Sequence, residues 1–431
     1  MAESNAMSSR ILRTIESIIK NDHELQEFTI IPTEDNTKNK SPVLYLEHNL
    51  GLESWCIKHV YQYACSVLFE HKLQLSRRKV PYSEMEKLNQ FLIGAILINP
   101  DVGTFWNMKR ELVERDVLKV EDELNFSKIV LSHKSKSNEA FAYRRWLLSR
   151  VLDKMATNNL EVPLNILQTE FSVADMASLK SPNNYHSWNH RIWCMENIGS
   201  HYNNVSHIVF SELSYSQEWI NNHISEHAGY HYRQYLIKLV KEHKKIVTLF
   251  ESFYNFVVKT LLNTTNDGDC GNLLTYLLGK PNRTRLLEET CSYVNYISIL
   301  LYDFVVLVDK LNKVFPEHEA LFSHRKFLAY HLLKVPCDYH GIEFKTKLDQ
   351  DKGLHVIDGK NITESDAVIN VKSDCESDRW PKLFKVSPSK SEIYNLYGIV
   401  SNCEKNFASQ NYSVLQLAKY RKWLAHVVGF E

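Results

Sequence analysis

Hydrophobic residues recur at helical spacing along most of the chain, and one pattern returns several times. It consists of a bulky aromatic residue, an arginine three positions later and a second aromatic residue five positions after the first. Four copies are complete: Phe141/Arg144/Trp146, Trp188/Arg191/Trp193, Tyr230/Arg233/Tyr235 and Phe322/Arg325/Phe327. The arginines are separated by 47, 42 and 92 residues, the last gap being about two periods. Periods of this size predict helical hairpins stacked into a solenoid.

Two degenerate copies flank the four complete ones. Trp106 has Lys109 in the place of the arginine, and near the end of the chain Arg421 and Trp423 keep their spacing after Ala418. Positions 0 and +5 lie about 140° apart on a helix, so a single apolar face does not need both aromatic residues. A helix packed between its hairpin partner and the next hairpin does. We therefore expect both aromatic residues in the core and the arginines as anchors between neighbouring hairpins.

The periodicity predicts an all-α protein in two regions. Residues 1–94 read as N-terminal helices, the first over residues 1–30, with a polar connector at 31–50. Residues 95–430 read as the repeat solenoid. Its helix pairs are expected at 118–132 with 138–155, 163–180 with 183–199, 201–221 with 225–243, and 293–314 with 317–333, and a further helix at 244–262. Periodicity is lost over residues 337–390, which predicts a flexible insertion.

Composition narrows the possible functions. The 51 basic residues balance the 51 acidic ones, so nothing indicates nucleic-acid binding. The 8 cysteines form no CxxC pair, which indicates reduced thiols in a cytoplasmic protein and neither a disulfide scaffold nor zinc fingers. The most apolar run, residues 296–308, contains Asp303 and is too short to span a bilayer. The N-terminus lacks the apolar region of a signal peptide. We expect a soluble protein without a transmembrane segment.

Two residues at expected helix starts are candidates for anion binding. Lys136 and His186 each lie just before, or in, the first turn of the second helix of a hairpin. Helix N-termini expose free N–H groups and carry positive potential, which suits phosphate. In a solenoid the equivalent helix starts line up along one edge, so this lysine and histidine could face one diphosphate. The alternative is that both are solvated loop residues.

A histidine series is a weaker candidate for a metal site. His223, His227 and His231 are spaced i, i+4, i+8 and are expected on one helix, where two of them could ligate a metal. No carboxylate or cysteine accompanies them in a zinc-site pattern. We therefore interpret them as a polar helix face and expect no metal site in this chain.

The segment Ser181–Gly199, SPNNYHSWNHRIWCMENIG, resembles the repeat of protein prenyltransferase α subunits, whose form is roughly P-x-N-Y-x-x-W-x-x-R-x-W. The residues that carry the resemblance stand at the family's spacing: Pro182, Asn184, Trp188, Arg191 and Trp193. Copies cover about residues 95 to 428. The small-residue pattern of tetratricopeptide repeats is absent. The interrupted array is most similar to the divergent branch of prenyltransferase α-subunit repeat-containing proteins.

The resemblance implies a right-handed α-α superhelix that wraps around a β subunit. That β subunit would carry the zinc, most of the isoprenoid pocket and the thiolate site, leaving no cofactor in this chain. The family has a lysine five residues before the aromatic residue of its second repeat, which matches Lys136. It also has a Tyr-His pair before the Trp of its third repeat, which matches Tyr185 and His186. The resemblance assigns Lys136 and His186 to contacts with the prenyl diphosphate.

One departure from the family concerns the acceptor. CaaX prenyltransferases have Tyr and Gln where this chain has Asn138 and Glu139. An ionised glutamate only accepts hydrogen bonds and repels a substrate carboxylate. By exclusion, the resemblance favours a Rab-type β partner and geranylgeranyl transfer to a cysteine in the C-terminal region of a protein substrate. The alternative is a non-catalytic α-solenoid that acts as a scaffold or escort for prenylated proteins.

Overall fold

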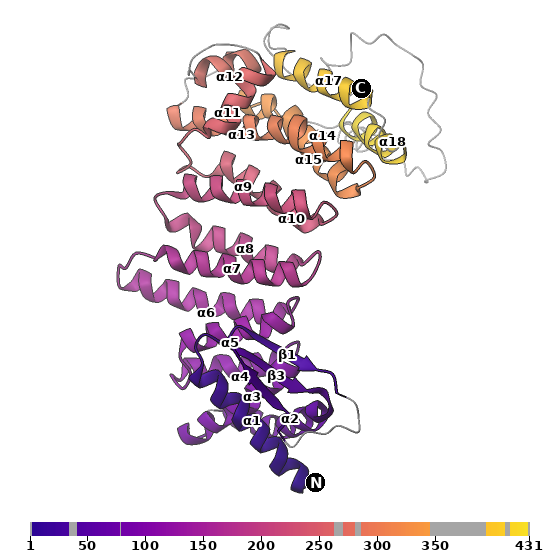
Figure 1. The fold of residues 1–431 in the computed structure, drawn as a ribbon. Coiled ribbons are helices and arrows are strands. Elements are labelled where there is room, and N and C mark those ends of the chain that lie inside the picture. Colours follow the sequence, from indigo (N-terminus) through magenta and orange to yellow (C-terminus); the bar gives the residue numbers. More distant parts are fainter. Residues whose placement is uncertain are drawn as a thin grey trace, which may run out of the picture. The chain divides into compact units, whose positions relative to one another are not determined.

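The computed structural model describes residues 2–33, 41–77, 79–262, 270–280, 286–344, 394–409 and 414–429. The chain divides into two units, Met1–Tyr202 and Asn203–Glu431. Each unit is built mainly from packed helices (Figure 1), which confirms the all-α repeat class expected from the sequence.

The first unit begins with a bundle of three helices. Helix α1 (Ala2–Asn21) packs against α2 (Ser54–Ser76) and α3 (Tyr82–Ile98). At the contact between α1 and α3, a Cβ atom on Gly94 would lie 2.0 Å from Cδ2 of Leu12. A larger residue there would force the Leu12 side chain to move, so the missing side chain of glycine lets the two helices approach closely.

A small sheet lies between α1 and α2, where the sequence analysis expected the end of a helix and a polar connector. Strand β1 (Glu27–Ile31) pairs in parallel with β3 (Asn49–Glu53), and β2 (Val43–Leu46) pairs antiparallel with β3, so the order is β1-β3-β2. The expectation was wrong because strands of four or five residues are too short to give a clear period. Glu47 and His48, both with positive φ (45° and 63°), make the β2–β3 turn, as in a two-residue hairpin loop.

The sheet is joined to the repeat array through β1. Phe28 is fully buried, and its backbone N–H donates to Ser132 Oγ over 3.0 Å. At the same strand, the carboxylate of Glu27 pairs with Lys180 Nζ over 2.9 Å. The N-terminal elements are thus anchored at the C-terminal ends of α5 and α7.

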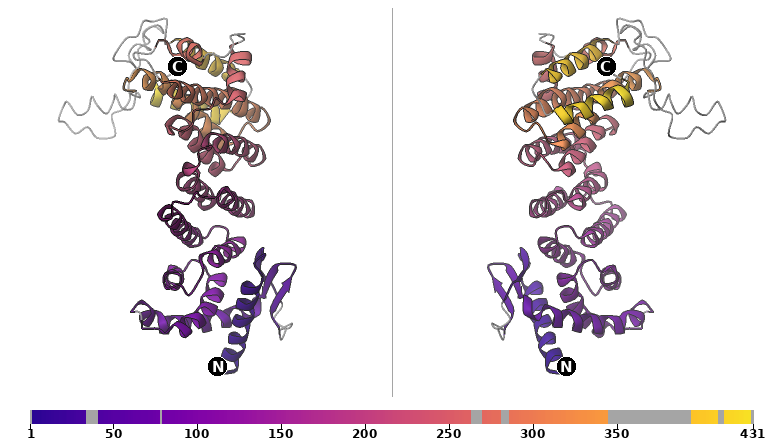
Figure 2. Two further views of the ribbon diagram at one scale, coloured as in Figure 1. Left: turned by 90° about the vertical axis from the view of Figure 1, so that its left-hand side faces the viewer. Right: turned by 90° about the vertical axis from the view of Figure 1, so that its right-hand side faces the viewer.

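The rest of the first unit is a row of helices in antiparallel pairs. Its elements are α4 (Gly103–Glu114), the hairpin of α5 (Val120–His133) with α6 (Asn138–Thr157), the hairpin of α7 (Leu164–Lys180) with α8 (Tyr185–Asn197), and a 3₁₀ turn, Gly199–His201. Figures 1 and 2 show α5 beside α6 and α7 beside α8. The boundaries agree with the sequence prediction to within a few residues.

The second unit repeats the hairpin principle with interruptions. Its elements are α9 (Val205–Asn222), α10 (His227–Glu242), α11 (Glu251–Asn255) with a π turn (Phe256–Leu261), α12 (Cys270–Leu278), α13 (Leu287–Tyr302), a π segment (Asp303–Leu307) leading into α14 (Val308–Val314), α15 (Glu319–His340), α17 (Tyr394–Ala408) and α18 (Val414–Trp423) with a π turn (Leu424–Val428). The helix expected from residue 244 begins only at Glu251. Helix α15 continues through Pro336 to His340, and residues 345–390 of the expected insertion lie outside the described residues.

One helical run of the second unit is long and apolar enough to cross a membrane by length and composition. It is Leu287–Val314, 28 residues with a mean hydropathy of 1.7 in its most apolar window. Within the protein, 72% of that window is buried. Asp303 in this run is fully buried and pairs with Arg233. These contacts are those of a core helix.

Candidate functional site

The starts of α6 and α8 carry the residues that the sequence analysis singled out. Helix α6 is capped by Ser137, whose Oγ accepts the N–H of Ala140 over 3.4 Å. Helix α8 is capped by Asn184, whose Oδ1 accepts the N–H of Ser187 over 3.3 Å. The predicted start at residue 183 was two residues early, because Asn183 has a left-handed conformation with φ 51°. Short polar side chains at these positions satisfy N–H groups that a helix start leaves unpaired.

Hydrogen bonds tie the two helix starts together. The Asn184 amide donates to the main-chain oxygen of Ser135 over 2.6 Å and to that of Ala177 over 3.0 Å. The hydroxyls of Ser135 and Ser181 lie 2.7 Å apart. Lys136 follows Ser135 in the chain. Tyr185 and His186 follow Asn184 as the first residues of α8, so hydrogen bonds join the loop that carries Lys136 to the helix start that carries the other two candidates.

The start of α4 continues this row. A Cβ atom on Gly103, the first residue of α4, would lie 3.4 Å from Oε2 of Glu139 in the first turn of α6. We call the resulting strip, formed by the first turns of α4, α6 and α8 and the loop residue Lys136, the helix-start edge. Its existence confirms that the equivalent helix starts lie side by side. The functional roles of its residues stay predictions.

The candidate side chains on the helix-start edge are accessible. Lys136 and Asn138 are exposed, Tyr185 is 49% exposed, and Glu139 and His186 are half-buried. Within the described parts of the chain, the Lys136 ammonium and the His186 ring make no hydrogen bond or ion pair. Both are therefore available to a ligand.

Charges of both signs surround the helix-start edge. Burial, together with the nearby Lys134 and Lys180, lowers the pKa of His133 at the end of α5. The Lys180 ammonium donates to the main-chain oxygen of Ser132 over 2.8 Å. Lys134 and Lys180 precede Ser135 and Ser181 in the chain, and the hydroxyls of these two serines are hydrogen-bonded. The N-terminal ends of α6 and α8 add positive potential here, whereas the C-terminal ends of α5 and α7 and the Glu27 carboxylate paired with Lys180 add negative potential.

Two of the repeat arginines anchor neighbouring hairpins, as expected, whereas Arg191 pairs with Asp175 of its own hairpin. Arg144 makes a bidentate pair with Glu170 of the next hairpin (2.6 and 2.7 Å), and its third nitrogen donates to the main-chain oxygen of Leu124 over 2.6 Å. Arg233 repeats this geometry with Asp303 (2.6 Å to each oxygen) and Leu213 (2.6 Å). All four of these charged side chains are buried. In each pair, the opposite charge compensates for the hydration that both groups lose on burial.

A fourth element of the repeat was missed from the sequence. The residue before each arginine is Tyr or His, it is fully buried, and it bonds a carboxylate of the preceding helix. The five pairs are Tyr143–Glu123 (2.8 Å), His190–Glu170 (2.9 Å), Tyr232–Glu212 (2.5 Å), His324–Asp303 (3.2 Å) and Tyr420–Glu404 (2.5 Å). The dipeptides Tyr-Arg and His-Arg were the available signal.

Two of these residues share a carboxylate with the arginine of the preceding repeat. The resulting clusters are Arg144–Glu170–His190 and Arg233–Asp303–His324. Burial opposes ionisation of Glu170, but Arg144 and His190 outweigh it and lower the pKa of that carboxyl to about 2. Burial lowers the pKa of His190 and of His324, so both rings are neutral near pH 7.

The second aromatic residue of the repeat is less buried than expected. The first aromatic residues, such as Trp188 and Phe141, are at most 2% exposed, whereas Trp146 and Trp193 are half-buried. Each second aromatic residue stacks on the Tyr or His three positions before it; the Tyr143–Trp146 centroids lie 5.7 Å apart. The prediction was wrong here because the +5 position lies at the border of the packed face.

Neither histidine grouping supports a metal site. His223 ends α9 and stacks on Trp219 at 4.0 Å, whereas His227 and His231 lie on α10, so the three do not share a helix. Glu170, His190 and Cys194 do lie within 4.8 Å of one another. Both oxygens of Glu170 already bind Arg144, and burial raises the pKa of the Cys194 thiol well above its usual value. This environment disfavours a further cation.

The fold and the repeat core define a helical-hairpin repeat protein, and comparison with known proteins places it in a family. The family model "Protein prenyltransferase alpha subunit repeat" matches residues 120–151 and 167–198. The chain is 30% identical over 332 residues to Protein prenyltransferase alpha subunit repeat-containing protein 1 of Homo sapiens, covering 74% of this chain and 77% of that protein. It is 27% identical over 463 residues to the 1-B protein of that name from Xenopus laevis, covering 99% of each. The chain belongs to the family of protein prenyltransferase α-subunit repeat-containing proteins.

A more distant similarity reaches prenyltransferase subunits. The chain is 27% identical over 185 residues to the Geranylgeranyl transferase type-2 subunit alpha of Saccharomyces cerevisiae, covering 42% of this chain and 52% of that subunit. This similarity makes the protein prenyltransferase-α-like.

Proposed function

We propose that the protein is the α subunit of a heterodimeric protein geranylgeranyltransferase in the cytoplasm. The observation that carries the proposal is the pair of hydrogen-bonded helix starts. The bond from Asn184 to Ser135 joins the loop that carries Lys136 to the helix start that carries Tyr185 and His186. A lysine, a histidine and free helix N–H groups on one edge suit a diphosphate. The similarity to type-2 geranylgeranyltransferase α subunits supports a Rab-type β partner.

In this proposal the partner supplies the chemistry that this chain lacks. Zinc held by the β subunit would lower the pKa of the acceptor thiol and so supply a thiolate nucleophile. Lys136 and His186 bind the diphosphate and stabilise the negative charge that grows on it as the bond to the isoprenoid breaks. The backbone N–H groups at the starts of α6 and α8 add positive potential without having to reorganise.

Tyr185, Asn138 and Glu139 would line the path of the substrates. Tyr185 is exposed on the edge beside His186, and Asn138 and Glu139 occupy the first turn of α6. The Glu139 carboxylate repels a free carboxylate at the end of an acceptor, which supports an acceptor other than an ordinary CaaX peptide.

Co-purification followed by a transfer assay tests the proposal. The chain is co-expressed with a Rab-type β subunit, and the purified complex is assayed with farnesyl and geranylgeranyl diphosphate on cysteine-bearing acceptor proteins. A stoichiometric heterodimer that transfers the geranylgeranyl group is the expected result. Failure to form a complex, or a complex without transfer, would instead favour the scaffold or escort for prenylated proteins.

A further inference from the structure

The C-terminal helices α17 and α18 pack on α12 and α15 of the second unit (Figure 1). Arg325 of α15 pairs with Asp309 of its own hairpin over 2.8 Å and with Glu404 of α17 over 3.2 Å. The Glu404 carboxylate also accepts the hydroxyl of Tyr420 on α18 over 2.5 Å. This carboxylate is therefore shared between two successive repeats, as are those of the two arginine–histidine clusters.

The aromatic contacts of α18 follow the repeat pattern as well. The first aromatic residue of a repeat lies against the Tyr or His of the following repeat, as Tyr230 does against His324, with ring centroids 5.4 Å apart. Phe322 makes the same contact with Tyr420, with centroids 6.4 Å apart. The pair α17–α18, which we call the C-terminal hairpin, thus occupies the place of the next repeat after α15.

The C-terminal hairpin covers an apolar face of the second unit. The Phe407 ring lies over the Arg325 guanidinium, with 3.5 Å between the carbon and the ring centroid. The Tyr397 hydroxyl donates to the main-chain oxygen of Leu333 on α15 over 3.1 Å. Six apolar side chains of the hairpin are each at most 6% exposed: Leu396, Val400, Phe407, Tyr420, Leu424 and Val428. Removal of the hairpin would expose the apolar residues that they cover, and exposed apolar patches of this kind promote association.

The outer side of the C-terminal hairpin lacks the features that hold a following repeat. Ala418 stands where the complete repeats have their first aromatic residue, and it is exposed. Arg421 is also exposed and makes no ion pair with any residue that the structure describes. A small residue at position 418 gives a following hairpin no ring to pack on. An altered outer face of this kind is typical of the terminal repeat of an array.

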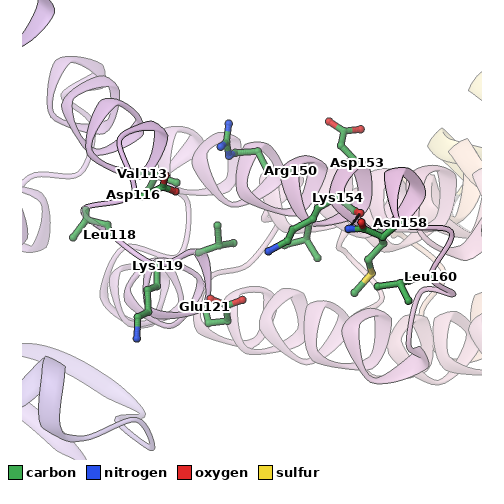
Figure 3. A pocket seen from close by; sticks show the side chains of 13 residues that line it. Val113, Asp116, Leu118, Lys119, Glu121, Arg150, Asp153, Lys154, Asn158 and Leu160 are labelled. Carbon is green, nitrogen blue, oxygen red and sulfur yellow. Dashed lines mark hydrogen bonds between the residues drawn. The ribbon is translucent and has the colours of Figure 1, made fainter. Parts of the chain in front are cut away.

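A groove of about 740 Å³ in the first unit differs from this face (Figure 3). It lies between the end of α4, the start of α5 and the C-terminal half of α6, and its rim carries charges of both signs. One of them, Arg150, already lies over the Trp146 ring at 5.2 Å. The lining selects no ligand class, whereas the face of α15 is filled by the chain itself.

We propose that the C-terminal hairpin is an end cap of the repeat array. It completes the anchor of Arg325 through Glu404 and covers an apolar face through which copies of the chain would otherwise associate. The inference goes beyond the proposed function and does not depend on it.

Cleavage of the chain between α15 and α17 tests whether the hairpin is held by these contacts. A site for a sequence-specific protease is inserted after Ser365 of the full chain. After cleavage, the hairpin should still co-elute with the rest of the chain in size-exclusion chromatography. Glu404→Lys places a second cation beside Arg325 and should raise the dissociation constant of the cleaved hairpin at least about a hundredfold. The matched control is Lys405→Glu, at an exposed position of the same helix, which should keep the hairpin bound.

Light scattering then tests the covering of the apolar face. Once the hairpin is released from the Glu404→Lys variant, the mass of the remaining chain should at least double, while the control keeps its mass. Hydrogen exchange at α9, α10 and α13 should stay slow, because these helices keep their own contacts. Co-elution of the hairpin in Glu404→Lys, or an unchanged mass after its release, would overturn the inference. Fast exchange throughout the second unit would also overturn it, because the hairpin would then be part of the folding core and not a cap.

Discussion

Asn184 donates its side-chain amide to the main-chain oxygen of Ser135 over 2.6 Å, and so fastens the start of α8 to the loop that carries Lys136. The same side chain also bonds Ala177 and caps α8. One buried amide therefore fixes the relative positions of residues from two adjacent hairpins. The helix-start edge depends on it.

Asn184→Ala should weaken both the fold and the edge. The variant leaves two main-chain oxygens without a donor and removes the cap of α8, which costs about 1–3 kcal/mol of unfolding free energy. Urea unfolding followed by Trp fluorescence measures the loss. Asn189→Ala, on the exposed face of the same helix, should change the stability little. An equally small effect at Asn184 would show that these bonds do not hold the edge.

Arg144→Ala and Arg233→Ala should each destabilise their own unit strongly. Either change leaves a buried carboxylate, Glu170 or Asp303, without its arginine, which costs about 3–5 kcal/mol. The control is Arg145→Ala, because the Arg145 side chain makes no ion pair with any described residue. Thermal unfolding of the variants provides the comparison. Losses no larger than that of the control would contradict the anchoring role.

The neutral His190 should make the first unit less stable in mild acid. Burial holds its pKa below the usual 6.5, so between these values the unfolded chain binds a proton that the folded chain does not. The contribution of the neutral ring to stability is therefore complete above pH 6.5. As the pH drops below that value, the free energy of unfolding falls by up to about 1.4 kcal/mol per pH unit for one histidine. His190→Gln should flatten the curve of unfolding free energy between pH 7 and 5. The control is His227→Gln, at an exposed position, which should show the same pH dependence of the unfolding free energy as the wild type. If His190→Gln also kept the wild-type pH dependence, the assignment to His190 would be refuted.

Glu139→Gln should change which acceptors the heterodimer accepts. The substitution removes a carboxylate from the helix-start edge and adds an amide that donates hydrogen bonds. We expect kcat/KM to rise for acceptor peptides that end in a free carboxylate next to the modified cysteine. Peptides with an amidated end serve as the matched substrates and should gain less. Equal changes in kcat/KM for the two kinds of peptide would show that Glu139 does not select the acceptor.

The sequence predicted the repeat class because each hairpin repeats its aromatic residues and arginine at fixed spacing. It also placed Lys136 and His186 at helix starts, since helix boundaries follow from the periodicity and from local capping residues. The partners of the arginines were not predictable. Asp303 lies 70 positions from Arg233, and which carboxylate faces which arginine depends on how the hairpins stack.

The sheet was missed because the sequence gives no periodic signal for it. Strands β1 to β3 are too short to show a period, and their pairing joins segments on both sides of a connector. The spacing of residues in the sequence shows which side chains share one face of a helix, but the contacts between elements depend on the tertiary structure.

Geranylgeranyl transfer by the purified heterodimer, wild type against the Lys136→Ala/His186→Ala double variant, tests the central claim most directly. Both complexes should elute as intact heterodimers, with Lys87→Ala as a control for loss of an exposed lysine. The double variant should lose at least about a hundredfold in turnover, because it removes two groups that stabilise charge on the departing diphosphate. Wild-type turnover in the intact double variant would contradict the account.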